Sequence, residues 1–322
     1  MGFAPSIPVA FGMLLVNMIG WGSWINTLKK CGNWRFEAYY WDFAWSIVVW
    51  TVLLSILLGG FDLNNFSLIG GLWAILGGFF WGLGNILLVA AIALTGFANA
   101  FPLALGIALI LGTTLAFITN PTATSNPVYL FAGLFMVLLA VIANGIAYKL
   151  KERGGIEKRN LQRGIIVSLL CGLILGLFPF PFNYAFAQGL SGYSGAVFMT
   201  IGGFLATVVL LPLIMKKPLV PKQPPIDVDE YLRAQPSWHG WAILAGLIWS
   251  MATVSNLVVA SMPNFSVAIA YTLGQCAPMI GALWGIFAWK EFRGAPKKSY
   301  AYLGLMFTLF IFGIFLLSKS IG

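Results

Sequence analysis

Long apolar segments dominate this chain of 322 residues and constrain its fold more than any other feature. A helix of about 20 apolar residues can cross the roughly 30 Å hydrocarbon core of a bilayer, because it pairs its own backbone amides and carbonyls. Only 8% of the residues are charged, against about 25% in an ordinary soluble domain. We therefore expect an all-α polytopic membrane protein. Its ten predicted spans are residues 8–28, 37–59, 69–94, 98–119, 128–149, 163–187, 193–215, 238–260, 265–289 and 299–318.

One stretch of the sequence occurs twice. WAILGGFFW at 73–81 returns as WAILAGLIW at 241–249, and six of the nine letters are identical. The two stretches lie in spans 3 and 8, so the repeated unit is five helices long, and an odd number of crossings turns the second copy upside down in the membrane. We expect two inverted five-helix repeats, 1–150 and 163–322, joined by a connector at 151–162. Such repeats are a recurring construction of secondary transporters.

The basic residues predict how the spans are oriented. Of the 18 Lys and Arg residues, all but Lys319 lie in odd-numbered loops, within residues 29–35, 149–163, 216–233 and 290–298. Cationic loops tend to stay in the cytoplasm, so we place the odd loops there and both termini on the non-cytoplasmic side of a plasma (inner) membrane. The net charge of +9 is then an orientation signal with some attraction to anionic lipid. Nucleic-acid binding is not expected.

Motifs for catalysis and metal binding are missing from the sequence. It contains no phosphate loop, HExxH or CxxC, and Cys31, Cys171 and Cys276 are scattered. We therefore expect no enzyme, cofactor, metal or disulfide, and uphill transport would have to draw on an ion gradient or on a partner solute. The first span has neither a basic flank nor a small-residue cleavage site, which predicts a retained helix and not a signal peptide.

Polar residues deep in apolar spans favour a transporter over an inert scaffold. Carboxamides donate and accept hydrogen bonds, and indole faces pack against C–H surfaces or planar rings, so together they suit a neutral ligand. Alternatively, the Asn side chains bond to neighbouring helices and the Trp residues lie at the headgroups. The residues that share helix faces are Asn17, Trp21 and Trp24 in span 1, Trp81 and Asn85 in span 3, and Trp249, Thr253 and Asn256 in span 8.

Prolines predict interruptions in two spans. Pro179 and Pro181 in span 6 cannot donate backbone hydrogen bonds, so the helix should kink or break there, and Pro278 does the same more weakly in span 9. A broken turn in lipid requires cover by protein or a water-filled cavity, although prolines also kink helices for packing alone. The polar residues placed beside such a cavity are Asn183, Tyr184 and Gln188 in span 6 and Tyr271 and Gln275 in span 9.

Asp42 is the acidic residue best placed for proton coupling. It lies about five residues into span 2, and a carboxyl half removed from water can take up and release a proton as its surroundings change. Glu37 is the second candidate. Both acids also lie near the start of their helix, where they would offset its dipole or pair with Arg35 or Lys30. We expect the single histidine, His239, to have an interfacial role.

Several stretches resemble one branch of the drug/metabolite transporter superfamily. FFWGLGNILLVAAIALTGFANAFPLALGIALILGTTLAFI, WRFEAYYWDFAW, SLLCGLILG and KLKERGG are similar to sequences of the rhamnose-proton symporter, the glucose/ribose porters and the plant ureide permeases. The resemblance covers most of the first half and the start of the second. It implies ten helices in two inverted repeats and uptake of a small polar solute, with protons. Asn85 falls in the W-G-x-G-N motif and Asp42 in the span 2 motif, whereas the second half keeps Trp249 without the G-x-G-N spacing.

These features together predict a permease for a small neutral polar metabolite, a sugar before a ureide or nucleobase, working by proton symport with alternating access. Two alternatives stay open. An exporter of aromatic or cationic compounds would suit the 13 Trp residues, but should have an acid at the centre of its cavity. A scaffold or receptor subunit would transport nothing. The expected partners are a small-molecule substrate, a proton and membrane lipid, and a homodimer is left open.

Overall fold

A computed structural model describes residues 5–58, 67–120, 126–151, 158–218 and 223–321. Every element in this part of the chain is helical, and ten stretches are long and apolar enough to cross a membrane, which confirms the predicted number of spans. In order they are α1 (Ile7–Ser23) with the 3-10 helix η1 (Trp24–Lys30), α2 (Phe36–Leu57), α3 (Leu68–Thr95), α4 (Phe97–Ile118), α5 (Pro127–Lys151), α6 (Lys158–Gly176) with α7 (Phe180–Ala187), α8 (Gly192–Lys216), α10 (Pro236–Ala260), α11 (Val267–Gly274) with α12 (Ala277–Leu283) and the π-helical turn η2 (Trp284–Ala288), and α13 (Lys297–Lys319). A short helix, α9 (Val228–Leu232), lies between spans 7 and 8.

The outer surface of the bundle carries large apolar side chains. Leu57 is 79% exposed and Phe287 is 73% exposed, which would be costly in water over so large an area. Small and hydroxylated residues such as Ser46 and Thr113 are instead fully buried. This distribution suits a helix bundle in lipid, where small and hydrogen-bonding residues hold the helices together.

Spans 6 and 9 are interrupted, as their prolines predicted. Pro179 lies at the junction of α6 and α7, and Gln275 and Cys276 separate α11 from α12. Because proline lacks an amide hydrogen, the helix cannot continue its bonding through these points. Both interruptions lie inside the bundle, against the cavity described below, where irregular backbone is tolerated at membrane depth.

Contacts between the helices follow a two-fold pattern. α3 of span 3 packs on α8 of span 7 as α10 of span 8 packs on α2, and α3 packs on α6 as α10 packs on α1, while α5 and α13 pack on each other. If every span of the first half is exchanged with the span five positions later in the chain, the same contacts result. Two halves related by a two-fold axis would produce this pattern. The pattern and the repeated stretch together support the predicted inverted repeat. Residues 152–157 of the predicted connector lie outside the described residues.

Glycines bring α3 and α8 into close contact. A methyl group added at Gly78 would overlap the Met199 carbonyl of α8, and one added at Gly202 would overlap the Ile75 carbonyl of α3. The two backbones can approach this closely only because both positions lack a side chain. The contact joins the first half of the chain (spans 1 to 5) to the second (spans 6 to 10).

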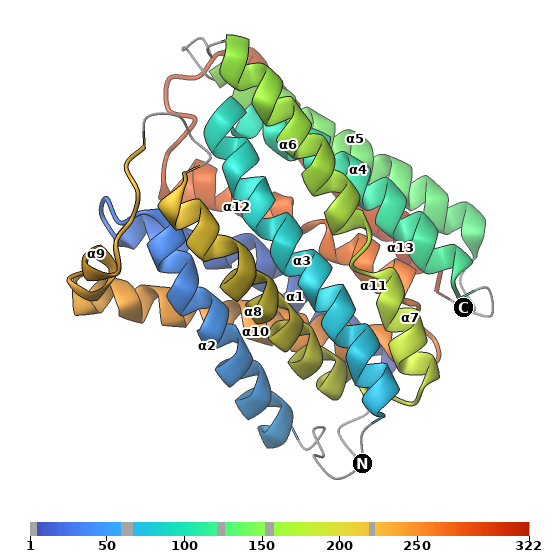
Figure 1. Cartoon of the computed structure of the whole chain (residues 1–322). Coiled ribbons are helices and arrows are strands. Elements are labelled where there is room, and N and C mark those ends of the chain that lie inside the picture. Colours follow the sequence, from blue (N-terminus) through green and yellow to red (C-terminus); the bar gives the residue numbers. More distant parts are fainter. Residues whose placement is uncertain (1–4, 59–66, 121–125, 152–157, 219–222, 322) are drawn as a thin grey trace.

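The basic loops gather at one end of the bundle, which we call the basic end. Lys29 from the end of span 1 pairs with Glu291 from the loop after span 9. Arg35, before span 2, donates a 2.5 Å hydrogen bond to the Pro224 carbonyl in the loop after span 7. Figure 1 shows α9 beside this end of the bundle.

Candidate solute cavity and buried carboxyl site

A cavity of about 570 Å³ lies at the seam between the two halves and extends to the basic end. Both halves contribute to its wall, through spans 1 to 6, 8 and 9. Its volume falls in the range typical of sites for small ligands. Seven of the sequence-predicted residues lie on this wall: Trp21, Trp24, Trp81, Asn85, Trp249, Tyr271 and Gln275.

Indole rings form much of the wall. The ring of Trp249 lies 4.3 Å from that of Trp81 and 6.3 Å from that of Trp21, measured between centroids. Trp24 stacks at 4.3 Å on Phe43, which lies behind the wall. These residues come from spans 1, 2, 3 and 8, and the repeated stretch supplies both Trp81 and Trp249. The wall therefore offers flat apolar faces to a ligand.

Carboxamides supply polar groups among these rings. Asn85 donates a 3.0 Å hydrogen bond from Nδ2 to the Tyr40 hydroxyl, and its carbonyl oxygen can accept a bond from a further donor. Asn144 of α5 also lines the cavity, and its buried Oδ1 has no hydrogen-bond partner in the protein. Gln275 lies at the junction of α11 and α12. Such groups can pair with the hydroxyl or amide groups of a neutral solute.

Three predicted residues of spans 1 and 8 lie behind the wall. Asn17 donates a 3.2 Å hydrogen bond to the Ala252 carbonyl and accepts one of 3.1 Å from Asn256. Thr253 accepts a 3.0 Å hydrogen bond from the indole nitrogen of Trp21. All three are buried. They join α1 to α10, as the alternative interpretation of these polar residues expected, and Thr253 also orients a wall residue.

The predicted residues of span 6 are not on the wall. Asn183 donates hydrogen bonds of 2.6 Å to the Ala116 carbonyl and 2.7 Å to the Thr119 hydroxyl, both of α4. Tyr184 stacks at 4.8 Å on Trp73 of α3. The break in span 6 reaches the cavity through Leu175 and Phe178 instead, which are apolar.

The far end of the cavity is closed by packed side chains. The Tyr271 hydroxyl donates a 2.9 Å hydrogen bond to the Ala108 carbonyl of α4. Beyond it, Phe11 of α1 meets Phe265 edge to face at 5.9 Å, just before α11. Contacts between spans 1, 4 and 9 thus close the end of the seam opposite the basic end.

An ion-pair cluster stands at the basic end of the cavity. Glu291 pairs with Lys29 and, at 3.4 Å, with Lys151, and it accepts a 3.2 Å hydrogen bond from the Tyr148 hydroxyl. Burial alone would raise the pKa of Glu291, but the hydrogen bond and charge of Lys29, with Lys151, outweigh it and hold the pKa below its ordinary value. The cluster links span 9 to spans 1 and 5.

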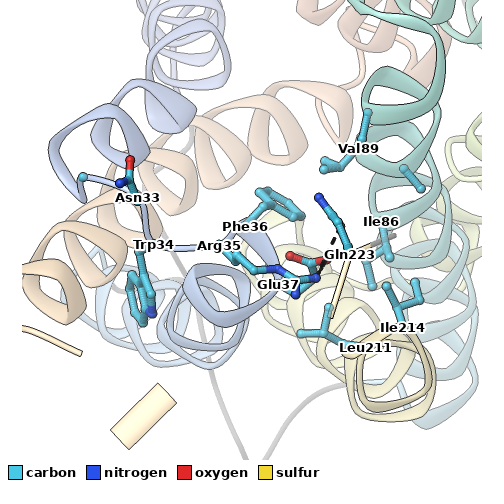
Figure 2. Close-up of a pocket in the computed structure, with 13 residues that line it drawn as sticks. Asn33, Trp34, Arg35, Phe36, Glu37, Ile86, Val89, Leu211, Ile214 and Gln223 are labelled. Carbon is cyan, nitrogen blue, oxygen red and sulfur yellow. Dashed lines mark hydrogen bonds and ion pairs between the residues drawn. The ribbon is translucent and has the colours of Figure 1, made fainter. Parts of the chain in front are cut away.

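A second cavity of about 350 Å³ adjoins the first near the start of α2 (Figure 2). Glu37, predicted as a proton-coupling candidate, lies here and pairs with Arg35 at 2.7 Å. Figure 2 shows Gln223 reaching over this pair, with Ile86 and Ile214 on the apolar side. Glu37 therefore has a fixed cationic partner.

Asp42 lies in neither cavity. The residue is only 2% exposed, and its carboxyl group accepts hydrogen bonds of 2.5 Å from the Tyr231 hydroxyl, 2.5 Å from Nδ1 of His239 and 3.1 Å from the indole nitrogen of Trp45. Arg35 and Lys30, the expected partners, do not pair with it. His239 thus belongs to a polar cluster with Asp42 and Tyr231, and the interfacial role expected of it from the sequence stays a prediction.

Sequence reasoning missed three residues of these sites, Asn144, Glu291 and Tyr231, and did not connect His239 with Asp42. Asn144 was visible as a carboxamide within an apolar span. The other three meet partners more than 100 residues away in the chain, so only the folded helices could reveal their roles. Among the described residues, no group of three or more His, Cys, Asp or Glu side chains could hold a metal ion.

Comparison with a solved structure supports the fold alone. One solved crystal structure of a protein superposes on this chain with a TM-score of 0.63 and 15% sequence identity, over 98% of each chain. A similarity this low in sequence carries no information on the solute.

Sequence comparison finds transporters. The chain is 33% identical to the L-rhamnose-proton symporter of Shigella sonnei over 171 residues, 49% of each protein. It is 24% identical to ureide permease 4 of Arabidopsis thaliana over 174 residues, 51% of this chain and 42% of the permease. The match thus spans about half the length of each relative, or less. The profile of the family described as sugar transport protein matches residues 12–318, and the chain therefore belongs to this family of membrane transporters.

Proposed function

We propose that the protein is a proton symporter for a small neutral polar metabolite, with a sugar as the first candidate. The cavity at the seam carries the proposal, because it surrounds a ligand with indole faces and carboxamides. Aromatic faces suit the C–H face of a sugar ring, and carboxamides suit its hydroxyl groups. The symporter among the relatives, named for L-rhamnose and protons, supports both parts.

The charges around the cavity support a neutral solute. Its charged wall residues are Lys29 and Glu291, which pair with each other at the basic end. The indole-lined part has no charged wall residue among those described. A site for an organic cation should place an acid there, so this arrangement disfavours the cation exporter.

A ureide or nucleobase is the second candidate. The three neighbouring indoles Trp21, Trp81 and Trp249 could hold a planar ring as readily as a sugar face, and several relatives are named ureide permeases. Amide-rich planar solutes would also pair with carboxamides. The choice between the candidates is therefore a matter for measurement.

Alternating access would follow from the two-fold arrangement. The seam is closed at Phe11 and Phe265 and reaches the basic end at Glu291, so this conformation presents the cavity to the basic end. With the basic loops in the cytoplasm, it is the inward-facing state. Rocking the halves about the cavity would expose it on the other side.

The test is uptake by the purified full-length protein in liposomes, with labelled L-rhamnose and labelled allantoin, a ureide, as probes. We expect accumulation of one probe when the outside is acidic, and loss of this accumulation in Asp42→Asn. Replacing Asn99, whose side chain bonds back to Thr95 and does not line the cavity, by Leu is the matched control. No flux or exchange of either probe or of a wider solute panel would favour a scaffold instead.

A further inference from the structure

The surroundings of Asp42 set it apart from the other acidic residues. It is the one acidic residue that is fully buried among those the structure describes. Its hydrogen bonds come from α9, α10 and its own helix α2. Because α2 belongs to the first half of the chain and α10 to the second, the bond to His239 crosses the seam.

Charge balance makes this pair a proton site. No Lys or Arg of the described residues pairs with Asp42, and His239 is its only ion-pair partner. A buried carboxylate without a cation is costly, so the pair is neutral overall when it holds one proton. Imidazole is the side chain that ordinarily changes charge near neutral pH. Loss of the shared proton would leave a net negative charge out of water.

The other titratable groups nearby are already paired or stay uncharged. Glu37 pairs with Arg35 two residues away. Burial raises the pKa of the Cys31 thiol to about 11. Burial, with the hydrogen bond and charge of Asp42, raises the pKa of Tyr231, so its phenol remains a donor.

The remaining charges on α9 lie away from the pair. Asp229 faces solvent with Arg233, at 78% and 84% exposure, and Glu230 is also exposed. None of these side chains bonds to Asp42 or His239. Among the described groups of this region, the pair itself is therefore the one left to bind a proton.

The pair is separate from the solute cavity yet connected to its wall. None of Asp42, His239 and Tyr231 lines the cavity. Phe43, the next residue of α2, stacks on Trp24 at 4.3 Å and meets Trp249 edge to face at 6.1 Å, and both indoles are wall residues. A shift of α2 against α10 would thus reach the cavity through Phe43.

α9 covers the pair. Besides the bond from Tyr231, the ring of Trp34 meets His239 edge to face at 4.9 Å and stacks on Tyr231 at 6.3 Å. His239 keeps 25% of its side-chain surface exposed, against 3% for Asp42. The imidazole is therefore the member through which a proton can reach solvent.

We propose that Asp42 and His239 together form a single proton-binding site, covered by Tyr231 of α9 and distinct from the solute cavity. The proton enters and leaves through the imidazole, and its presence strengthens the contact of α2 with α10. The coupling part of this inference rests on the proposed function. The proton site itself can be tested without any solute.

The first test is NMR of the full-length protein labelled with ¹³C,¹⁵N-histidine and purified with a histidine-free tag. His239 is the only histidine of the chain, so one imidazole signal reports its protonation. Asp42→Asn removes the negative partner of the imidazole, and we expect the imidazole signal of this variant to depend on pH differently from that of the wild type. Tyr231→Phe removes a donor that shares the carboxylate, and it should change this dependence on pH in the opposite sense.

Opposite shifts in the two variants are the signature of a shared site. The matched control is Asp229→Asn, which removes an exposed carboxylate of α9 and should leave the signal unchanged. Identical titrations in the wild type, Asp42→Asn and Tyr231→Phe would overturn the proposal. If Asp42→Asn does not fold, Tyr231→Phe alone decides, because it leaves the pair in place.

The second test separates coupling from transport. In liposomes, exchange of labelled for unlabelled L-rhamnose or allantoin at equal pH needs no net proton movement, whereas accumulation under a pH gradient does. We expect Asp42→Asn and His239→Gln to exchange the transported probe, but to accumulate about tenfold less of it than the wild type. Accumulation by His239→Gln at the wild-type level would overturn the pair as the coupling site. Failure of the wild type to exchange either probe would instead refute the proposed function and leave the NMR result standing.

Discussion

At the scale of single residues, the structure divides the carboxamides of the spans into two sets. Asn85 lies on the cavity wall, whereas Asn17 lies behind it and bonds to Asn256 and Ala252. Both were predicted to bind the solute. A helix face shows which residues point into the bundle, but it does not show which of them line the cavity. The two positions therefore allow a matched test.

Asn85→Leu should weaken binding of the transported solute about tenfold, since it removes one hydrogen bond of about 1.4 kcal/mol. Without solute it should lower the unfolding temperature less than Asn17→Leu does, because Asn85 makes one internal hydrogen bond, to Tyr40, and Asn17 makes two. Asn17→Leu should do the reverse. It leaves buried partners unpaired at a cost of about 1 kcal/mol and lowers that temperature while solute affinity stays near the wild-type value. Thermal unfolding with and without the solute measures both. Equal effects of the two changes would refute the division.

Glu291 gives stability a dependence on pH. Its pKa is lowered, chiefly by Lys29 acting against burial. The folded state therefore binds this proton more weakly than the unfolded state, and the stabilisation is present above the ordinary carboxyl pKa of about 4.3. It is lost as the pH falls through the lowered value.

We expect wild type to unfold at a higher temperature than Glu291→Gln at pH 7, with the difference shrinking below about pH 4. Thermal unfolding across this range is the measurement. Glu230→Gln, at an exposed position of α9, is the control and should match wild type throughout. A difference between wild type and Glu291→Gln that persisted at pH 3 would show that the charge is not its source.

At the scale of helices, α3 and α8 depend on glycine for their contact. Gly78→Ala would place a methyl group against the Met199 carbonyl, so the helices must separate and we expect the unfolding temperature to fall by several degrees. Gly304→Ala on α13 is the matched control, because nothing lies within 4 Å of the added carbon. There, the higher helix propensity of alanine should leave stability equal or slightly raised. Thermal unfolding in one detergent compares the two.

Helices were easier to predict than their partners. Hydrophobic length located the ten spans, and Pro179 located the break in span 6, because both effects are local to the chain. α9 was not predicted, since the segment around it is short and rich in proline. Its position depends on distant contacts, such as the hydrogen bond from Arg35 to Pro224 and that from Tyr231 to Asp42.

At the scale of the whole molecule, the distribution of basic residues predicts the orientation in the membrane. Lys149 lies exposed near the basic end, and Asn126 lies exposed where α5 begins, at the opposite end. In a variant lacking the three buried cysteines, a membrane-impermeant maleimide added to intact cells should label a cysteine at position 126 and not one at position 149. Labelling at position 149 alone would invert the proposed orientation.

The final prediction concerns the exchange between two states. Phe101 lines the cavity that reaches the basic end, and Phe265 is buried at the closed end. If the halves rock about the cavity, opening one end must close the other. A maleimide should therefore label Phe101→Cys from the basic side in the absence of solute, while Phe265→Cys stays protected.

Solute together with a proton gradient should slow labelling of Phe101→Cys and speed labelling of Phe265→Cys, because both ligands shift the population between the two states. Lys149→Cys, exposed near the basic end, is the control and should react at a constant rate. A scaffold would show no dependence on solute at any position. Rates that rose at both ends together would indicate a continuous channel, which the packed contact of Phe11 with Phe265 argues against in the present conformation.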